Sequence, residues 1–208
     1  MFAAVQTSGD KGLLPLGTTT MLGHVIARLA PQVGPMVLNA NGDPARFASF
    51  GLPVVADPID GFVGPLAGIL AGLLWVQQHA PEITHAISVS ADVPFLPSDL
   101  VERLMAASSK APTQIAIAQS VGKESAGDQS VGDMHPVIGC WPVAHAGHLE
   151  AALRDGVRKV LRWTDVHGTI PVAFPMLDIG GEPVDPFFNA NTPAELETAQ
   201  RLMARLAT

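Results

Sequence analysis

The feature that most constrains the fold is the alternation of short apolar runs with helical patterns over most of the chain. Alternation of this kind, with near-continuously apolar strands, is typical of a parallel sheet covered by helices on both faces. The sequence therefore predicts an α/β fold with a mostly parallel sheet. Strands are expected at residues 2–6, 36–39, 53–56, 86–90, 114–119, 135–142 and 170–174.

The composition fits one domain spanning residues 1–208, because a chain with 48% hydrophobic and 15% charged residues can bury a full core. The Gly/Ser/Asp-rich run at 120–133 is expected to be a mobile loop within it. A net charge of −7, with the Lys and Arg residues scattered, argues against a nucleic-acid partner. The chain shows neither a signal-peptide pattern nor a long apolar segment, so no membrane association and a cytoplasmic location are expected.

The apolar run that begins at Ile87 stops at the acidic residue Asp92, and Pro94 and Pro97 prevent its continuation as a central strand. Asp92 therefore lies at the carboxyl end of a predicted strand, which is the edge where open α/β sheets bind ligands. A carboxylate there, without a nearby Lys or Arg in the sequence, could hold a divalent cation. The alternative is that Asp92 only caps the following turn.

The glycines at the start of the predicted helix from Gly64 onward permit two interpretations. Gly64 and Gly68 could let backbone N–H groups approach a ligand, or they could allow close packing of helix on sheet.

Cys140 is the only cysteine, and its apolar neighbours predict a buried structural thiol. His145 and His148 share a predicted helix face, but without a third ligand nearby an incidental surface pair is favoured over a metal site.

Seven short motifs are spread from one end of the chain to the other. They are Asp10-Lys11-Gly12-Leu13-Leu14, Asn39-Ala40-Asn41, Ala56-Asp57, Gly64-Pro65-Leu66-Ala67-Gly68, Asp92-Val93-Pro94, His135-Pro136 and Asn189-Ala190-Asn191-Thr192-Pro193. They occur in the order found in bacterial molybdenum cofactor guanylyltransferase, and on them the chain resembles that family. The Asp-x-Pro motif is shared by many nucleotidyltransferases, whereas the ordered set ending in Asn-x-Asn-Thr-Pro is specific to this family and its near relatives.

The resemblance implies a Rossmann-like three-layer α/β/α sandwich that transfers GMP from GTP to the molybdopterin form of the cofactor and releases pyrophosphate. It implies Mg²⁺ as the metal and GTP and the molybdopterin cofactor as ligands. It also implies that the protein is a monomer and that its protein partners are molybdoenzymes or their chaperones. Three alternatives stay open: a molybdenum cofactor cytidylyltransferase, a sugar-phosphate nucleotidyltransferase, and a non-catalytic cofactor-binding relative.

By the same resemblance, Asp92 is the expected metal ligand, and Asp92 and Lys11 are the expected catalytic residues. For Asn39 a turn-forming role, and for His135 a structural role, remain as alternatives to ligand contact. The expected pterin contacts are His135, Asn189 and Asn191. The expected nucleotide-binding residues are Lys11, Asn39, Asp57, Gly64, Pro65, Leu66, Gly68 and Asp92.

One segment departs from the family pattern. Where the family has Leu-Ala-Gly-Gly followed by arginines before Asp-Lys-Gly, this chain has Ala4-Val5-Gln6-Thr7-Ser8-Gly9. Most of the Gly-rich loop that would wrap the triphosphate is therefore missing. The expectation is either that residues precede Met1 in the full protein or that the chain is a divergent member with weak nucleotide binding.

Overall fold

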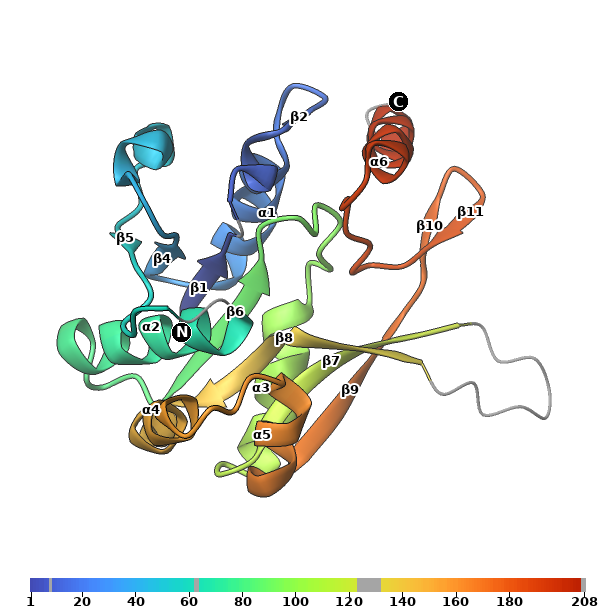
Figure 1. Cartoon of the computed structure of the whole chain (residues 1–208). Helices are drawn as coiled ribbons and strands as arrows, with labels where there is room; N and C mark the ends of the chain where they lie inside the picture. The colour runs from blue at the N-terminus through green and yellow to red at the C-terminus, as the bar shows by residue number, and fades with distance from the viewer. Residues whose placement is uncertain (8, 62–63, 123–131, 207–208) are drawn as a thin grey trace, which may run out of the picture.

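A seven-stranded sheet forms the centre of the molecule (Figure 1). The computed structural model describes residues 1–7, 9–61, 64–122 and 132–206. The strand order is β5-β4-β1-β6-β8-β7-β9. The strands are β1 (Phe2–Gln6), β4 (Met36–Asn39), β5 (Val54–Val55), β6 (His85–Ser90), β7 (Ile115–Val121), β8 (Asp133–Pro142) and β9 (Thr169–Pro175).

The sheet is mostly parallel, as the sequence predicts. β1 pairs in parallel with β4 and β6, β4 with β5, and β7 with β9. The exception is β8, which runs antiparallel to both of its neighbours, β6 and β7. The local sequence pattern predicts β8 as a strand, but it carries no information on whether the strand runs parallel or antiparallel to its neighbours.

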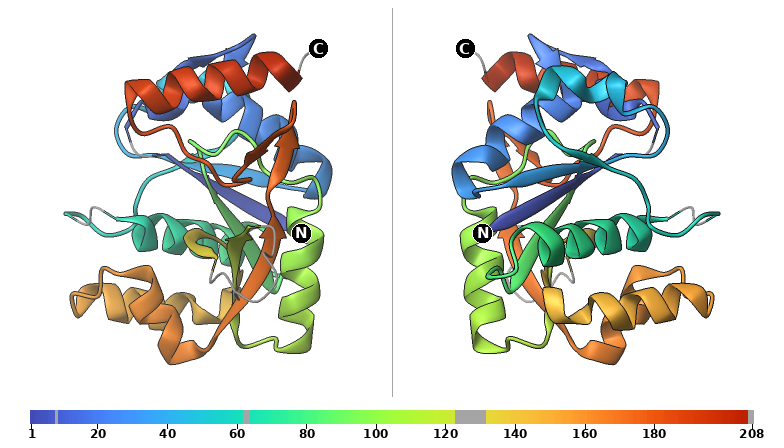
Figure 2. Two further views of the ribbon diagram at one scale, coloured as in Figure 1. Left: turned by 90° about the vertical axis from the view of Figure 1, so that its right-hand side faces the viewer. Right: turned by 90° about the vertical axis from the view of Figure 1, so that its left-hand side faces the viewer.

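Helices cover both faces of the sheet, which confirms the three-layer α/β/α prediction (Figure 2). Along β1, Ala3 and Val5 pack with the helices on one face, whereas Phe2 and Ala4 pack with those on the other, because side chains alternate along a strand. In the part of the chain that the structure describes, no helix is long and apolar enough to span a membrane. One face carries α1 (Met21–Leu29) and α3 (Leu100–Lys110); the other carries α2 (Pro65–His79), α4 (Ala146–Arg154) and α5 (Val160–His167).

A third, smaller apolar cluster lies beside the sheet and was not predicted. It joins α6 (Pro193–Leu206) to residues of two short hairpins, β2 (Pro15–Leu16) with β3 (Thr19–Thr20) and β10 (Leu177–Ile179) with β11 (Glu182–Val184). Gly17, Gly180 and Gly181 take positive φ in the hairpin turns. The described part of the chain also contains four short 3-10 helices: η1 (Lys11–Leu13), η2 (Ala30–Gln32), η3 (Pro44–Phe50) and η4 (Val143–His145).

α6 begins with a capping box. Thr192 Oγ1 accepts from the Glu195 N–H at 3.2 Å, and Glu195 Oε2 accepts from the Thr192 N–H at 2.8 Å. The Glu195 carboxylate accepts hydrogen bonds from the Asn191 N–H and from the hydroxyl and N–H of Thr192, and these bonds lower its pKa.

The predicted loop at 120–133 is shorter than expected at both ends. β7 continues to Val121 and β8 begins at Asp133, where Ser120 and Asp133 are paired in the sheet. Residues 123–131 of the predicted loop lie outside the described residues, so its mobility stays a prediction.

Candidate functional site

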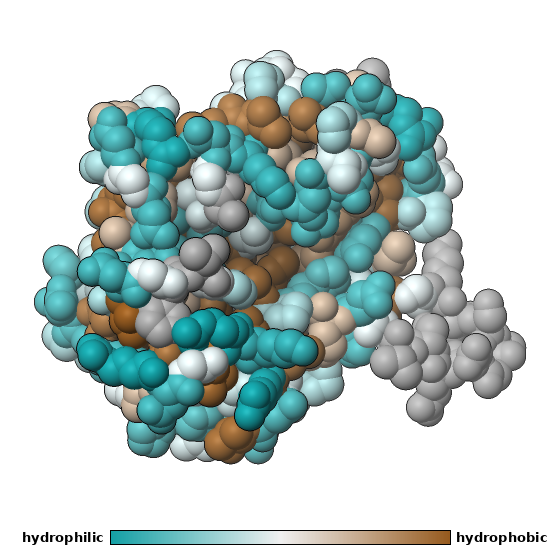
Figure 3. Space-filling model, viewed as in Figure 1, coloured by the Kyte–Doolittle hydropathy of each residue, from teal (hydrophilic) through white to brown (hydrophobic). Residues whose placement is uncertain are grey.

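A cleft of about 660 Å³ opens at the carboxyl ends of β1, β4 and β6. In Figure 3 the same face of the molecule is hollowed near its centre. This position agrees with the rule that open α/β sheets bind ligands at the carboxyl edge of their strands. The cleft is lined by Gln6, Thr7, Gly9, Asn39, Ala40, Asn41, Gly42, Arg46, Asp57, Gly64, Pro65, Ser90 and Val137.

Asp57 organises the polar wall of the cleft. Asn39, the last residue of β4, donates from Nδ2 to Asp57 Oδ1 at 3.0 Å and to the Val55 carbonyl at 3.2 Å. Asn41 donates to Asp57 Oδ2 at 2.7 Å and accepts from the Asp57 N–H at 2.9 Å. Two amides therefore fix the orientation of one carboxylate, and Asn39 does more than form a turn.

Gln6, at the end of β1, is a site residue that the sequence interpretation missed. Its side chain is buried, it lines the cleft, and its Nε2 atom has no hydrogen-bond partner among the described residues. A buried amide donor without a partner is unfavourable in the absence of a ligand or water. The Gln6 amide is therefore available to a ligand in the cleft.

Gly68 makes room for these amides. A Cβ atom on Gly68 would lie 2.2 Å from Asn39 Oδ1 and 2.8 Å from Gln6 Oε1. The packing interpretation of Gly68 therefore has direct support. Leu66 is buried with its side chain in the core, so only its backbone could meet a ligand. Gly64 and Pro65, at the start of α2, line the cleft.

Arg46 supplies a cation to the cleft from a segment that no motif pointed to. It lies in η3, forms an ion pair with Asp10, and donates to the Asn41 carbonyl at 2.6 Å. The shortened N-terminal loop itself carries no arginine, but Arg46 lines the same cleft as Thr7 and Gly9. A guanidinium there could meet a phosphate group of a ligand.

Lys11 and Asn191 lie in direct contact although they belong to motifs at opposite ends of the chain. Lys11 Nζ donates to Asn191 Oδ1 at 3.0 Å, and both residues are exposed. Neither residue lines the cleft. Gly9, which lies two residues before Lys11, does line it. Arg46, which pairs with the adjacent Asp10, lines it as well. Asn189 is exposed as well.

Asp92 lies just beyond the cleft-lining residue Ser90, whose hydroxyl donates to Asp92 Oδ1. Its carboxylate is half-buried, and no Lys or Arg pairs with it among the described residues. An oxygen ligand of this kind, with free lone pairs and no competing cation, suits a hard divalent metal.

His135 belongs to a hydrogen-bonded chain rather than to the cleft lining. Its Nε2 atom lies 3.0 Å from Ser120 Oγ, which donates to Asp185 Oδ2 at 3.1 Å. Burial lowers the pKa of His135, against the opposing effect of Asp185 and Asp133. The structural alternative for His135 is therefore supported by its contacts, and its role as a pterin contact stays a prediction.

Cys140 is buried as predicted, and burial raises the pKa of its thiol to about 11. The prediction that His145 and His148 form an isolated pair is wrong, because His167 from α5 lies with them. His167 supplies the third imidazole ring, and the sequence pattern around His145 and His148 does not indicate it because His167 belongs to a different helix.

Sequence comparison identifies the family. A family model described as MobA-like NTP transferase domain matches residues 4–168. A molybdenum cofactor guanylyltransferase of Bradyrhizobium sp. (strain ORS 278) is 51% identical over 94% of this chain and 86% of its own length. The chain belongs to the molybdenum cofactor guanylyltransferase family. A second family member, from Rhodopseudomonas palustris (strain BisB5), is 48% identical over 95% of this chain and 87% of its own length.

Solved structures agree on the fold. The molybdopterin-guanine dinucleotide biosynthesis protein A of Archaeoglobus fulgidus superposes with a TM-score of 0.69 at 20% identity, covering 99% of this chain and 100% of its own. A CMP:2-keto-3-deoxy-manno-octonic acid synthetase solved with CTP superposes with a TM-score of 0.70 at 13% identity, covering 99% of both chains. At these identities the likeness concerns the nucleotidyltransferase fold alone.

Proposed function

We propose that this protein transfers GMP from GTP to the molybdopterin form of the molybdenum cofactor, forming the guanine dinucleotide cofactor and releasing pyrophosphate. The observation that carries the proposal is the 51% identity to a molybdenum cofactor guanylyltransferase over 94% of the chain. The cleft supports it independently, because a cleft with amide, carboxylate and guanidinium side chains at the carboxyl edge of the strands suits a nucleotide.

The amide and carboxylate groups of the cleft wall suit the base and ribose. Asp57 offers carboxylate oxygens as acceptors, which the N–H groups of guanine or the ribose hydroxyls require. The unpartnered Gln6 amide offers a donor, which a carbonyl such as guanine O6 requires. Gly64 and the start of α2 would allow the ligand to approach the backbone closely.

Lys11 and Arg46 are the cations proposed for the phosphate end of the nucleotide. In the reaction a phosphate oxygen of the pterin substrate attacks the α-phosphorus of GTP. The bond between the α-phosphorus and the oxygen that bridges it to the β-phosphate breaks, and pyrophosphate leaves with that oxygen. Negative charge then accumulates on the departing pyrophosphate, where a positioned cation stabilises it. The attacking phosphate is already ionised, so no side chain needs to remove a proton from it.

Asp92 is the proposed ligand of the divalent metal, and Mg²⁺ is the proposed ion because an oxygen ligand and phosphate groups suit it. Bound there, the metal would screen the two anions and polarise the α-phosphate. The Ser90 hydroxyl orients the carboxylate. Asn189, Asn191 and His135 remain the proposed pterin contacts, and the whole of 1–208 is proposed to act as one domain.

The test is pyrophosphate release by the purified protein with Mg²⁺ and molybdopterin, compared for GTP, CTP and UTP. GTP is expected to be the preferred substrate, with no release when the pterin is omitted. Preference for CTP would instead identify a cytidylyltransferase. Tight pterin binding without turnover of any nucleotide would identify a cofactor-binding relative.

The substrates indicate where in the cell the protein acts. GTP is a cytoplasmic metabolite, so the proposal places the protein in the cytoplasm. We also propose that it acts as a monomer and passes its product to molybdoenzymes or their chaperones. Sedimentation of the purified protein tests the monomer.

A further inference from the structure

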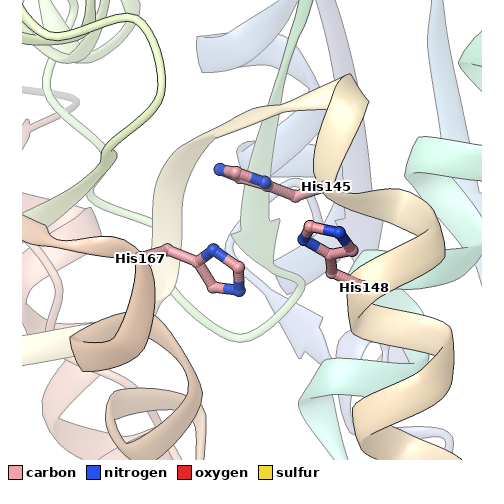
Figure 4. Close-up of side chains that lie close together, drawn as sticks. All are labelled: His145, His148 and His167. Atoms are coloured by element: carbon pink, nitrogen blue, oxygen red, sulfur yellow. The ribbon is translucent and has the colours of Figure 1, made fainter.

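Three histidine side chains from separate segments lie close together (Figure 4). His145 ends η4, His148 lies in the first turns of α4, and His167 ends α5. One ligand nitrogen of each ring lies within 4.8 Å of the others. The ring centroids of His145 and His167 are 4.4 Å apart, and those of His148 and His167 are 5.7 Å apart.

Strand direction separates this histidine cluster, defined as His145, His148 and His167, from the nucleotide cleft. His145 follows the end of the antiparallel strand β8, and His167 precedes the start of β9. The start of β6 pairs with the end of β8, through His85 and Pro142, so the cluster lies at the amino edge of the parallel strands. The cleft lies at their carboxyl edge.

His145 is held in the form that a metal ligand needs. Its Nε2 atom lies 2.7 Å from the Thr113 carbonyl oxygen. Because a carbonyl can only accept, Nε2 carries a hydrogen, and in the neutral ring Nδ1 is then the atom with the free lone pair. Metal-binding histidines are oriented in this way, by donating their second ring N–H to a carbonyl or carboxylate.

The alternative explanation is an aromatic cluster without a metal. Trp163 is buried and lies 4.6 Å from His167 and 6.1 Å from His145, centroid to centroid, so aromatic packing explains the positions of these two rings. It does not explain His148, which is exposed and whose ring, within the described ranges, contacts only the rings of the other two histidines. No carboxylate pairs with any of the three among the described residues.

We propose that His145, His148 and His167 bind a late first-row divalent transition metal ion, with Zn²⁺ as the expected ion and water in the fourth position. Three neutral imidazoles suit such an ion, whereas Mg²⁺ prefers oxygen ligands. A Zn–N distance of about 2.0–2.1 Å requires the rings to move closer than in the structure. Rotation of the exposed His148 side chain can supply much of that movement. The bound ion would join α4 to α5 away from the reaction.

The test is calorimetric titration of the tag-free, EDTA-treated protein with ZnCl2, in excess Mg²⁺ so that the Asp92 region is occupied. One equivalent is expected to bind. His148→Ala should weaken that binding at least about tenfold, because it removes one of three ligands. The control is His79→Ala, which removes an exposed helical histidine stacked on Trp75 and should leave binding unchanged.

Two further readouts are independent of activity. Co²⁺ in place of Zn²⁺ should give the visible absorption of a four- or five-coordinate site, which His148→Ala should lose. Zn²⁺ at about one hundred times its Kd should raise the Tm of the wild type by about 5–10 °C. The proposal is overturned if Zn²⁺ does not bind, or if His148→Ala binds it as tightly as His79→Ala does.

Discussion

Lys11 Nζ donates a hydrogen bond to Asn191 Oδ1 at 3.0 Å, although the two residues lie near opposite ends of the chain. The bond joins the short loop after β1 to the segment that leads into α6. Because the capping box of Thr192 and Glu195 fixes that segment, the lysine has a rigid partner. The C-terminal motif thus positions a cation that belongs to the N-terminal one.

The first prediction distinguishes the contribution of Lys11 to GTP binding from that of its hydrogen-bond partner Asn191. If Lys11 contacts the phosphates, Lys11→Ala should weaken GTP by roughly ten- to hundredfold, as expected for a charge-assisted bond of about 1.5–3 kcal/mol, with a much smaller effect on the pterin. Asn191→Ala should weaken GTP less, because the ammonium group remains. Titration calorimetry with each ligand measures both variants. Equal loss for GTP and pterin in Lys11→Ala would show that the lysine has a structural role.

Asp57→Asn is expected to weaken GTP by about tenfold or more while the fold is kept. The change places an NH2 group against the amides of Asn39 and Asn41, which both donate to this side chain, and it removes the acceptor charge. The matched control is Asp60→Asn, a neighbouring exposed aspartate outside the cleft lining. Unchanged GTP affinity in Asp57→Asn would remove this residue from the nucleotide site.

Gly68→Ala is expected to lower both stability and GTP affinity. The new methyl group would overlap Asn39 Oδ1 and Gln6 Oε1, and overpacking of this kind reduces the free energy of unfolding by about 1–3 kcal/mol. Gly147→Ala is the control. Its new Cβ would have no described residue within 4 Å apart from its chain neighbours and the backbone of its own helix, and in α4 it should stabilise by up to about 1 kcal/mol. Urea denaturation measures both, and equal stability of the two variants would contradict the packing account.

Cys140 should resist thiol reagents until the protein unfolds. Burial raises the pKa of its thiol to about 11, so the reactive thiolate is scarce at pH 8, and the side chain is inaccessible. Labelling should therefore follow the urea unfolding transition. Rapid stoichiometric labelling of the native protein would show that the region around β8 opens far more readily than its packing indicates.

The layered fold could be predicted because strand and helix patterns alternate along the chain and because most strands are near-continuously apolar in sequence. The direction of β8 and the hairpins β2–β3 and β10–β11 could not. A strand's direction depends on its neighbours, and a hairpin with strands of two or three residues leaves too short a pattern.

The site was predictable only in part, for a physical reason. Asn39, Asp57, Gly64 and Pro65 lie at or next to the ends of regular elements, so their place at the sheet edge can be derived from the order of the strands. Arg46 reaches the cleft from a surface helix, and its sequence neighbourhood gives no signal of that. Gln6 did carry a signal, as the polar last residue of an apolar strand, that the sequence interpretation left unused.

The most direct test of the central claim follows labelled GTP through the reaction with molybdopterin and Mg²⁺. Label in the α-phosphate should appear in the guanine dinucleotide cofactor, and label in the γ-phosphate should appear in pyrophosphate. Asp92→Asn, a nearly isosteric change, should keep the fold and lose most of this turnover, whereas Asp155→Asn, an exposed change at the end of α4, should keep it. The account is contradicted if the α-label stays out of the pterin product, or if Asp92→Asn turns over normally at limiting Mg²⁺.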